Sequence, residues 1–250
     1  MPDLRTLVHM LLPPLLVKGM QVIRDRFCRT REASLPCREL AKLFPGILDC
    51  RVEIPARQIR REGGMLPLAE LLTLAAVCQW LRPRLALEIG TFKGASTLVM
   101  AMNMPPEANI CTLDLPPGAS QLTYALDIGS IAGQPYVVGE HFQCTPFADR
   151  IQQLYGDSAV WDFTPLQGRV DLVFVDGNHA YENVLADSRN AFRCLRPGGV
   201  ILWDDYHPTY GPGVMRALAE VSEGAIHCVQ GTRFAVYVAG RSADDGSRHG

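Results

Sequence analysis

Short apolar runs alternate with segments of helical spacing between residues 66 and 240. Runs of alternating or continuous apolar residues predict strands at 84–89, 109–115, 151–155, 170–175, 200–203, 225–229 and 233–238. Apolar residues at helical spacing predict helices at 66–81, 95–104, 181–195 and 214–221. This alternation predicts an α/β protein with a doubly wound, mostly parallel seven-stranded sheet, whose last strands form a closing antiparallel hairpin.

The segments on either side of this region carry no such alternation. Residues 1–65 are interrupted by prolines, and we expect an N-terminal helical extension that acts as a lid or a dimer interface. The apolar run at 7–17 is too short to cross a bilayer as a helix. We expect it to be an amphipathic docking segment rather than a membrane-surface contact. Residues 241–250 are polar, and we expect a disordered tail.

Composition narrows the functional class. The 250 residues include 24 Lys and Arg against 26 Asp and Glu, a net charge of −2, which argues against a nucleic-acid partner. The eight cysteines are scattered without a C-x-x-C pair, so neither a zinc ribbon nor a thioredoxin-like site is indicated. We expect reduced thiols and a cytoplasmic location.

Ligands of a doubly wound sheet bind at the carboxyl ends of its strands, and the first of these ends carries a glycine loop. Residues 88–94 read E-x-G-x-x-x-G, in which Gly90 permits a tight turn and Gly94 a close backbone approach. Phe92 stands where a dinucleotide fingerprint requires its second glycine, which argues against a nicotinamide cofactor. Asp114 ends the second strand, where its carboxylate could accept ribose hydroxyls or cap a turn.

Two further strand ends deliver carboxylates and an imidazole. Asp176 follows one strand, and Asp204 and Asp205 follow the next, so these carboxylates should converge. Their mutual repulsion requires a cation or a proton, and their oxygens suit Mg²⁺, Mn²⁺ or Ca²⁺. His179 is a candidate general base. Turn capping by the aspartates and ordinary packing by the histidine remain the alternatives.

The order of these motifs resembles a known family. E-x-G-x-x-x-G, a strand-end Asp, Gly-Asp-Ser at 156–158, VDLVFVDGNHAYENV, LRPGGVILWDDY and GTRFAVYV are similar to class I S-adenosylmethionine-dependent methyltransferases. The resemblance is strongest to the bacterial small-molecule branch with an Asp-Gly-x-His-x-Tyr loop, and extends to metal-dependent sugar and catechol O-methyltransferases. It covers residues 66–240 and implies the Rossmann-like methyltransferase fold.

The resemblance also implies residue roles. The cofactor, S-adenosylmethionine, would be bound by Glu88, Gly90, Thr91, Gly94, Asp114, Asp157, Ser158 and Asp176. A divalent ion, Mg²⁺ or another, would be held by Asp176, Asp204 and Asp205. His179 would be the base, as in the sugar type, with Asp176 as the other catalytic residue; Asp205 stands where the catechol type often has Asn.

These implications together predict an O-methyltransferase that acts on a hydroxylated small molecule, such as a sugar or a natural-product intermediate. The long connection at 115–150 would contact this acceptor, and it includes Tyr124, Tyr136, His141 and Phe142. Alternatives are a metal-independent N- or O-methyltransferase and a non-catalytic cofactor-binding partner protein. A homo-oligomer formed through the N-terminal helices also stays open.

Overall fold

The structure is a computed structural model, and it describes residues 34–56, 65–119, 122–125, 136–221 and 225–240. The chain divides into residues 1–34 and residues 35–250. The apolar run at 7–17 and the predicted tail at 241–250 lie outside the described residues.

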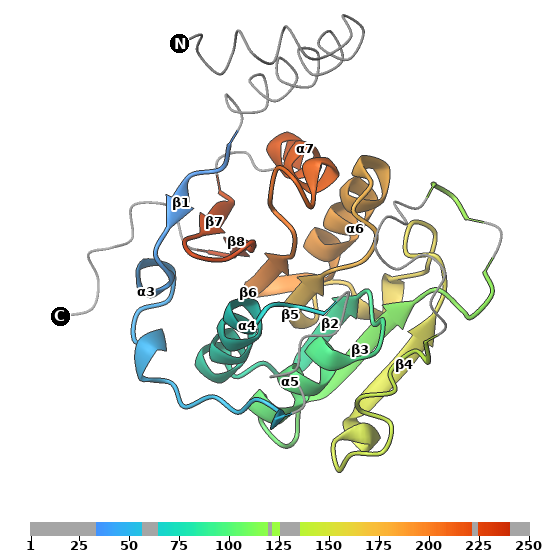
Figure 1. The fold of residues 1–250 in the computed structure, drawn as a ribbon, viewed down its shortest axis with the longest axis horizontal. Coiled ribbons are helices and arrows are strands. Elements are labelled where there is room, and N and C mark those ends of the chain that lie inside the picture. Colours follow the sequence, from blue (N-terminus) through green and yellow to red (C-terminus); the bar gives the residue numbers. More distant parts are fainter. Residues whose placement is uncertain (1–33, 57–64, 120–121, 126–135, 222–224, 241–250) are drawn as a thin grey trace, which may run out of the picture. The chain divides into compact units, whose positions relative to one another are not determined.

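A mixed sheet forms the centre of the unit from residue 35 onward (Figure 1). Within the described residues it has eight strands in the order β1-β7-β8-β6-β5-β2-β3-β4. The strands are β1 (Cys37–Arg38), β2 (Leu85–Ile89), β3 (Asn109–Asp114), β4 (Ile151–Tyr155), β5 (Val170–Val175), β6 (Leu195–Trp203), β7 (His227–Val229) and β8 (Ala235–Val238). Strand β8 is antiparallel to β6 and β7, and the other pairs are parallel, which confirms the predicted doubly wound sheet and closing hairpin.

The eighth strand, β1, corrects the predicted count of seven. It comes from the segment that we expect to be a helical extension, and it pairs with β7 at the end of the sheet. The amide of Cys228 donates to the Pro36 carbonyl at 3.0 Å, and that of Gln230 donates to the Arg38 carbonyl at 2.8 Å. A two-residue strand is too short for alternation to be visible in the sequence, which is why the pattern does not reveal it.

Helices cover both faces of the sheet. Helices α4 (Leu68–Leu81) and α5 (Ala95–Asn103) pack on one face, and α6 (Tyr181–Cys194) and α7 (Pro212–Val221) on the other. The short helix α3 (Leu40–Leu43) and 3-10 turns at Ile47–Asp49, Ala148–Arg150 and Thr164–Leu166 complete the helical elements of the described residues. Predicted and observed helix ends differ by one or two residues, as boundaries usually do.

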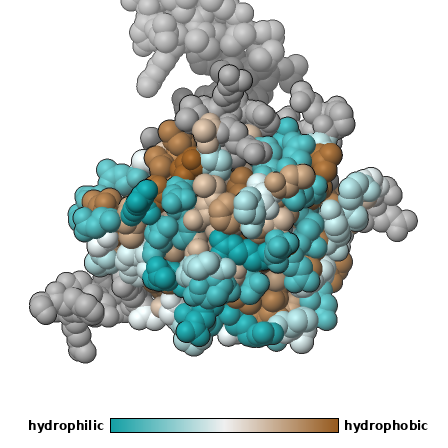
Figure 2. Space-filling view, turned by 90° about the horizontal axis from the view of Figure 1, so that it is seen from below, coloured by the Kyte–Doolittle hydropathy of each residue, from teal (hydrophilic) through white to brown (hydrophobic). Residues whose placement is uncertain are grey.

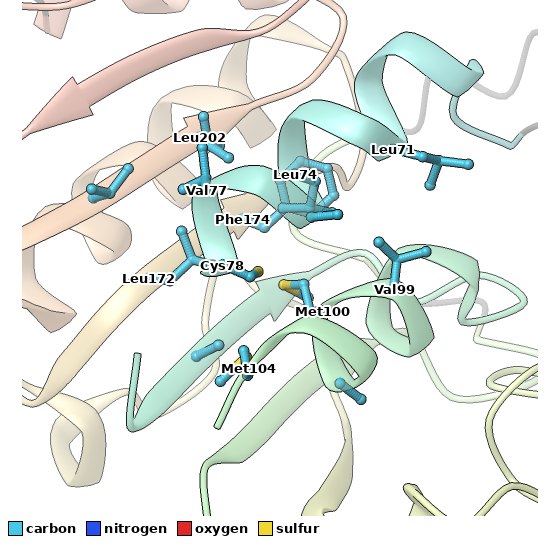
Figure 3. Close-up of a cluster of buried hydrophobic side chains, with 14 of the residues drawn as sticks. Leu71, Leu74, Val77, Cys78, Val99, Met100, Met104, Leu172, Phe174 and Leu202 are labelled. Atoms are coloured by element: carbon cyan, nitrogen blue, oxygen red, sulfur yellow. The ribbon is translucent and has the colours of Figure 1, made fainter. Parts of the chain in front are cut away.

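The hydrophobic core lies in two layers because successive strand residues point to opposite faces. In β5, Leu172 and Phe174 face α4 and α5, whereas Val173 and Val175 face α6 and α7. Figure 3 shows the first layer, where side chains of α4 and α5 meet those of β5 and β6. Helix α4 ends at Leu81 because Pro83 follows and Arg82 adopts a left-handed conformation with φ +50°.

Hydrophilic and hydrophobic residues are mixed on the surface of the described residues. In Figure 2, hydrophilic residues cover most of one face and hydrophobic residues form smaller areas between them. Among the described residues no helix is both long and apolar enough to cross a membrane. The cysteines in this part of the chain are free thiols.

Candidate active site

The carboxyl ends of β2, β5 and β6 lie side by side. In the register of the sheet, Ile89 pairs with Val175, which in turn pairs with Trp203. The amide of Asp176 donates to the Ile89 carbonyl at 2.8 Å, and that of Asp204 donates to the Val175 carbonyl at 3.0 Å. Asp176 and Asp204 therefore leave neighbouring strands at the same level, where the sequence predicts that they converge.

His179 lies between two carboxylates of this cluster. Its Nδ1 is 3.2 Å from Asp205 Oδ2, and its Nε2 is 3.6 Å from Asp176 Oδ1. Asp205 has φ +53°, a left-handed backbone that is rare for a residue with a side chain and is concentrated at functional sites. Nδ1 can donate its proton to Asp205, whereas Nε2 is buried and faces Asp176.

A guanidinium completes this cluster, and the sequence analysis did not identify it. Arg233 Nη1 is 2.5 Å from Asp205 Oδ1, and Nη2 is 3.7 Å from Asp204 Oδ2. Its Nε also donates to Glu70 Oε1 in α4, at 3.4 Å. Arg233 lies in the turn between β7 and β8, so the closing hairpin delivers a positive charge to the carboxyl end of β6.

The positive charge of Arg233 is needed because the carboxyl groups beside it are buried. Asp204 is 4% exposed, and burial raises its pKa well above the usual range. The neighbouring charges of Asp176 and Asp205 raise the pKa further, whereas the guanidinium of Arg233 lowers it. Burial also raises the pKa of Asp176, opposed by its hydrogen bond with His179. The site thus contains the convergent carboxylates of the prediction together with a cation from the chain itself.

The loop after β2 turns against this cluster. Gly90 has φ +101°, and a Cβ there would lie 2.0 Å from the carbonyl oxygen of Asp176. Only glycine fits this position, because both the backbone conformation and the close approach exclude a side chain. Phe92 also has a left-handed backbone, with φ +47°. The loop therefore holds its backbone close to the ends of β2 and β5.

Asp114 lies at the next strand end and is tied to the same loop. Its Oδ2 accepts a hydrogen bond from the Phe92 amide at 2.6 Å, and its Oδ1 accepts one from the Leu115 amide at 2.7 Å. Burial raises the pKa of this carboxyl group, and the backbone N–H donors oppose the shift. Each oxygen keeps a lone pair for a further donor, so the geometry is compatible with the predicted contact to ribose hydroxyls.

Glu88 is directed into the protein. It is fully buried beneath α5, where Oε1 accepts from the hydroxyl of Ser96 at 2.6 Å. Oε2 accepts from Thr97 and Thr112, each at 2.5 Å, and Thr91 Oγ1 lies 2.6 Å from Thr112 Oγ1. Burial raises the pKa of Glu88 to about 7, and these hydroxyls oppose the shift. The observed contacts of Glu88 and Thr91 join β2, β3 and α5, and their predicted contact with a cofactor stays a prediction.

Comparison with known proteins identifies this arrangement. Residues 87–206 match a family model described as a methyltransferase domain. Over these residues the chain is similar to a methyltransferase domain. A catechol O-methyltransferase of Mycobacterium tuberculosis is 30% identical over 125 residues, which make up 50% of this chain and 49% of that protein. The chain spans less than two thirds of the length of the curated relatives it matches.

Solved structures share the fold of this methyltransferase domain. Cofactor-bound Rv0187 from MTB has a TM-score of 0.53 at 21% identity, covering 96% of this chain and 98% of that one. The O-methyltransferase TomG from Streptomyces achromogenes, in complex with SAM, has a TM-score of 0.53 at 18% identity, covering 76% and 92%. These likenesses confirm the Rossmann-like methyltransferase fold. Arg233 and Glu70 lie outside the residues that match the family model.

The region predicted to contact the acceptor packs on the loop of the methyltransferase domain. The ring of Phe142 fills the space beside Gly94, where a Cβ would come within 2.5 Å of it. Tyr136 packs on Phe92 with ring centroids 4.6 Å apart, and His141 is buried. The close approach at Gly94 is therefore made by Phe142, and its predicted contact with a cofactor stays a prediction. Tyr124 is partly exposed.

The predicted adenine side of the methyltransferase domain contains a further carboxylate. Asp157 accepts from the amides of Thr123 and Ala159 at 2.7 and 3.0 Å. Burial would raise its pKa, but these hydrogen bonds outweigh burial and lower it. Asp187 of α6 is 1% exposed, and burial raises its pKa to about 7 while a hydrogen bond with the Ser158 side chain opposes the shift. Asp187 has no sequence signal of its own, because it occupies one polar position of an amphipathic helix.

The predicted metal ligands do not fit a divalent ion in the observed arrangement. Within the described residues, no group of three or more His, Cys, Asp and Glu side chains is arranged to hold a metal ion. The guanidinium of Arg233 contacts Asp205 Oδ1, which the prediction assigns to the metal. At about 4 Å and an effective dielectric constant of 20, a divalent ion beside a guanidinium experiences a repulsion of about 8 kcal/mol. We therefore derive no step through a metal ion.

A cavity of about 580 Å³ lies at the opposite end of the strands. It opens where β2, β3 and β4 begin, and its lining includes Leu85, Asn109, Arg150, Ile151 and Arg169. Ligands of doubly wound sheets bind at the carboxyl ends of the strands, so this cavity is separate from the candidate active site.

Proposed function

We propose that this protein transfers a methyl group from S-adenosylmethionine to a hydroxyl oxygen of a small molecule. The observation that carries the proposal is the position of His179, which lies between Asp176 and Asp205 at the carboxyl ends of the strands. The catechol O-methyltransferase relative and the O-methyltransferase structures with the same fold support the oxygen acceptor. The hydroxylated acceptor remains a sugar or a natural-product intermediate in this proposal.

The chain offers a fitting site for the cofactor. Gly90 leaves its backbone without a Cβ beside Asp176, and Asp114 presents a carboxylate whose orientation is fixed by two backbone amides. Asp114 would hold the ribose hydroxyls, and Asp157 with Ser158 would flank the adenine. When bound, S-adenosylmethionine supplies a methyl group on a positively charged sulfur, which is already activated for transfer.

The residues of the chain then have to position the acceptor and remove its proton. In this proposal the imidazole moves so that Nε2, which is buried beside Asp176, reaches the acceptor hydroxyl and accepts its proton. The oxygen is then free to form its new bond to carbon. Asp205 receives the Nδ1–H and thereby fixes the orientation and the tautomer of the imidazole. General-base catalysis of this kind contributes roughly 10²–10⁴-fold to a rate.

The expected metal ion has no part in this mechanism, because Arg233 contacts Asp205 and lies near Asp204. This contact favours the metal-independent alternative over the metal-assisted one. The free thiols of the described residues support the proposal that the protein works in the cytoplasm.

Calorimetric titration with S-adenosylhomocysteine tests the cofactor site. We expect binding to the full chain and a loss of at least tenfold in affinity in Asp114→Ala. The matched control is Asp49→Ala, an exposed aspartate outside the candidate site. Absence of binding to the wild-type protein would remove the basis of the proposal and would contradict the cofactor-binding alternative as well.

An acceptor screen tests the chemistry. Hydroxylated compounds, including catechols and sugars, are incubated with S-adenosylmethionine carrying a labelled methyl group, and products are analysed by mass spectrometry. A product methylated on oxygen supports the proposal. A product methylated only on nitrogen would contradict the assignment of the acceptor atom while leaving the cofactor site intact.

A further inference from the structure

The candidate active site has a cation that belongs to the chain. We propose that Arg233 is the resident cation of this site: it takes the position that a divalent metal ion would take among the carboxylates and positions Asp205 against His179. This inference rests on the proposed function for its catalytic consequence, whereas its statement about the cation stands on the geometry alone.

The contacts of Arg233 link it to both aspartates that follow β6. Nη1 contacts Asp205 Oδ1 at 2.5 Å, and Nη2 is 3.7 Å from Asp204 Oδ2. The other carboxylate oxygen of Asp205, Oδ2, is 3.2 Å from His179 Nδ1. Asp205 thus lies between the guanidinium and the imidazole, so Arg233 acts on His179 through Asp205 and is a positioning residue.

The guanidinium is fixed from several sides. The backbone amide of Arg233 donates to Glu70 Oε1 at 3.1 Å, and its Nε donates to the same oxygen at 3.4 Å. Its carbonyl accepts from the Tyr206 amide at 2.8 Å, and the ring of Tyr210 lies 5.2 Å from the guanidinium. The side chain is only 18% exposed. Because the guanidinium is part of the chain and is held against Glu70 of α4, it does not exchange with ions of the solvent.

The chain already supplies a positive charge at this position without a metal ion. Glu70, Asp204 and Asp205 face the guanidinium, and Asp176 faces the imidazole. An arginine keeps its charge at every pH relevant to proteins, so it is a permanent cation. Removing it would leave a set of buried carboxylate oxygens without their partner, which is the donor set that Mg²⁺ and Mn²⁺ prefer.

This reasoning predicts that one substitution converts the site into a metal site. Mn²⁺ binding to the full-length protein is followed by electron paramagnetic resonance of the free ion. We expect no saturable binding to the wild-type protein at millimolar Mn²⁺. Arg233→Ala should bind Mn²⁺ at least tenfold more tightly than the wild-type protein, and the double variant with Asp204→Asn should lose this gain. The matched control is Arg189→Ala, which removes an arginine from an exposed ion pair with Glu220.

The results that would overturn the proposal are equally specific. Saturable Mn²⁺ binding to the wild-type protein that disappears in Asp204→Asn would show that a metal already has this position. Failure of a folded Arg233→Ala variant to gain Mn²⁺ binding would also refute the proposal. If Arg233→Ala does not fold, Arg233→Lys serves in its place, because lysine keeps the positive charge. This variant should fold and should not bind Mn²⁺. Mn²⁺ binding by the lysine variant would contradict the proposal.

A kinetic measurement tests the positioning role once an acceptor is known. Arg233→Lys should lower kcat at least tenfold with little change in the KM for S-adenosylmethionine, and a chelator should not alter wild-type turnover. If a chelator lowered the kcat of the wild-type protein as much as Arg233→Lys does, the metal-independent role of Arg233 would be refuted. The Mn²⁺ experiments need no turnover, so failure of the proposed function and failure of this inference remain distinguishable.

Discussion

Replacing Glu88 by glutamine should change how stability depends on pH. The carboxyl group is fully buried, and burial raises its pKa from 4.5 to about 7. Between these values the folded protein binds a proton that the unfolded chain releases, so this group makes the protein less stable as the pH rises. The contribution is fully present below pH 4.5 and is lost as the pH rises through 7. From pH 5 to pH 8 the loss amounts to about 2.5 kcal/mol.

Glutamine keeps the shape of the side chain but does not ionise. Its amide can accept hydrogen bonds from Thr97 and Thr112 through the oxygen and donate to Ser96 through the nitrogen. The unfolding free energy of Glu88→Gln, relative to that of the wild-type protein, should therefore rise by about 2.5 kcal/mol between pH 5 and pH 8.

Urea denaturation at pH 5, 6, 7 and 8, followed by tryptophan fluorescence, measures this difference. The matched control is Glu107→Gln, the same substitution at an exposed position. The control should follow the wild-type profile within about 0.5 kcal/mol. Parallel profiles of Glu88→Gln and the wild-type protein would refute the reasoning, because they would mean that Glu88 is ionised in the folded state throughout this range.

Three further substitutions test the site and its scaffold. Gly90→Ala should destabilise the protein by about 3 kcal/mol or more in urea denaturation, because its Cβ would lie 2.0 Å from a carbonyl oxygen, whereas Gly231→Ala, with open space around it, should cost only about 1 kcal/mol. A similar loss in both would contradict the steric argument. Asp114→Asn should weaken S-adenosylhomocysteine binding about tenfold in calorimetry without changing the melting temperature by more than a few degrees; unchanged affinity would exclude the ribose contact. His179→Gln should lower kcat about 10²-fold or more with an unchanged cofactor affinity, and full turnover in this variant would exclude it as the base.

The sheet could be predicted because its signals are local. Each of the buried strands is a run of apolar residues that ends in a polar or glycine residue, as 170–175 ends before Asp176. Parallel strands bring their carboxyl ends to one edge, so the convergence of Asp176 with Asp204 follows from the pattern alone. The contacts of a side chain do not follow from this pattern. Glu88, whose contact with the cofactor is implied only by the resemblance, lies beneath α5 and accepts a hydrogen bond from Ser96.

Arg233 could not be found by searching strand ends, because it precedes a strand. A signal nevertheless exists in the register of the closing hairpin. Trp203 pairs with Ala235 in the antiparallel pair of β6 and β8, so continuing the pair outward places Asp205 opposite residue 233. Register reasoning applied beyond the last paired residue would have identified the guanidinium, whereas a search for motifs treats it as the first residue of a polar turn.

The order in which the chain is made gives the position of Arg233 a consequence for folding. Asp176, His179, Asp204 and Asp205 all precede it, and the last of them is synthesised 28 residues earlier. A nascent chain that ends before the hairpin has these acidic groups and lacks the arginine that contacts Asp205 and lies near Asp204. Buried carboxylates without a partner are strongly destabilising, so we expect this edge of the sheet to close only after residue 233 has been added. The active site and this edge of the sheet would then be completed in the same late step of synthesis.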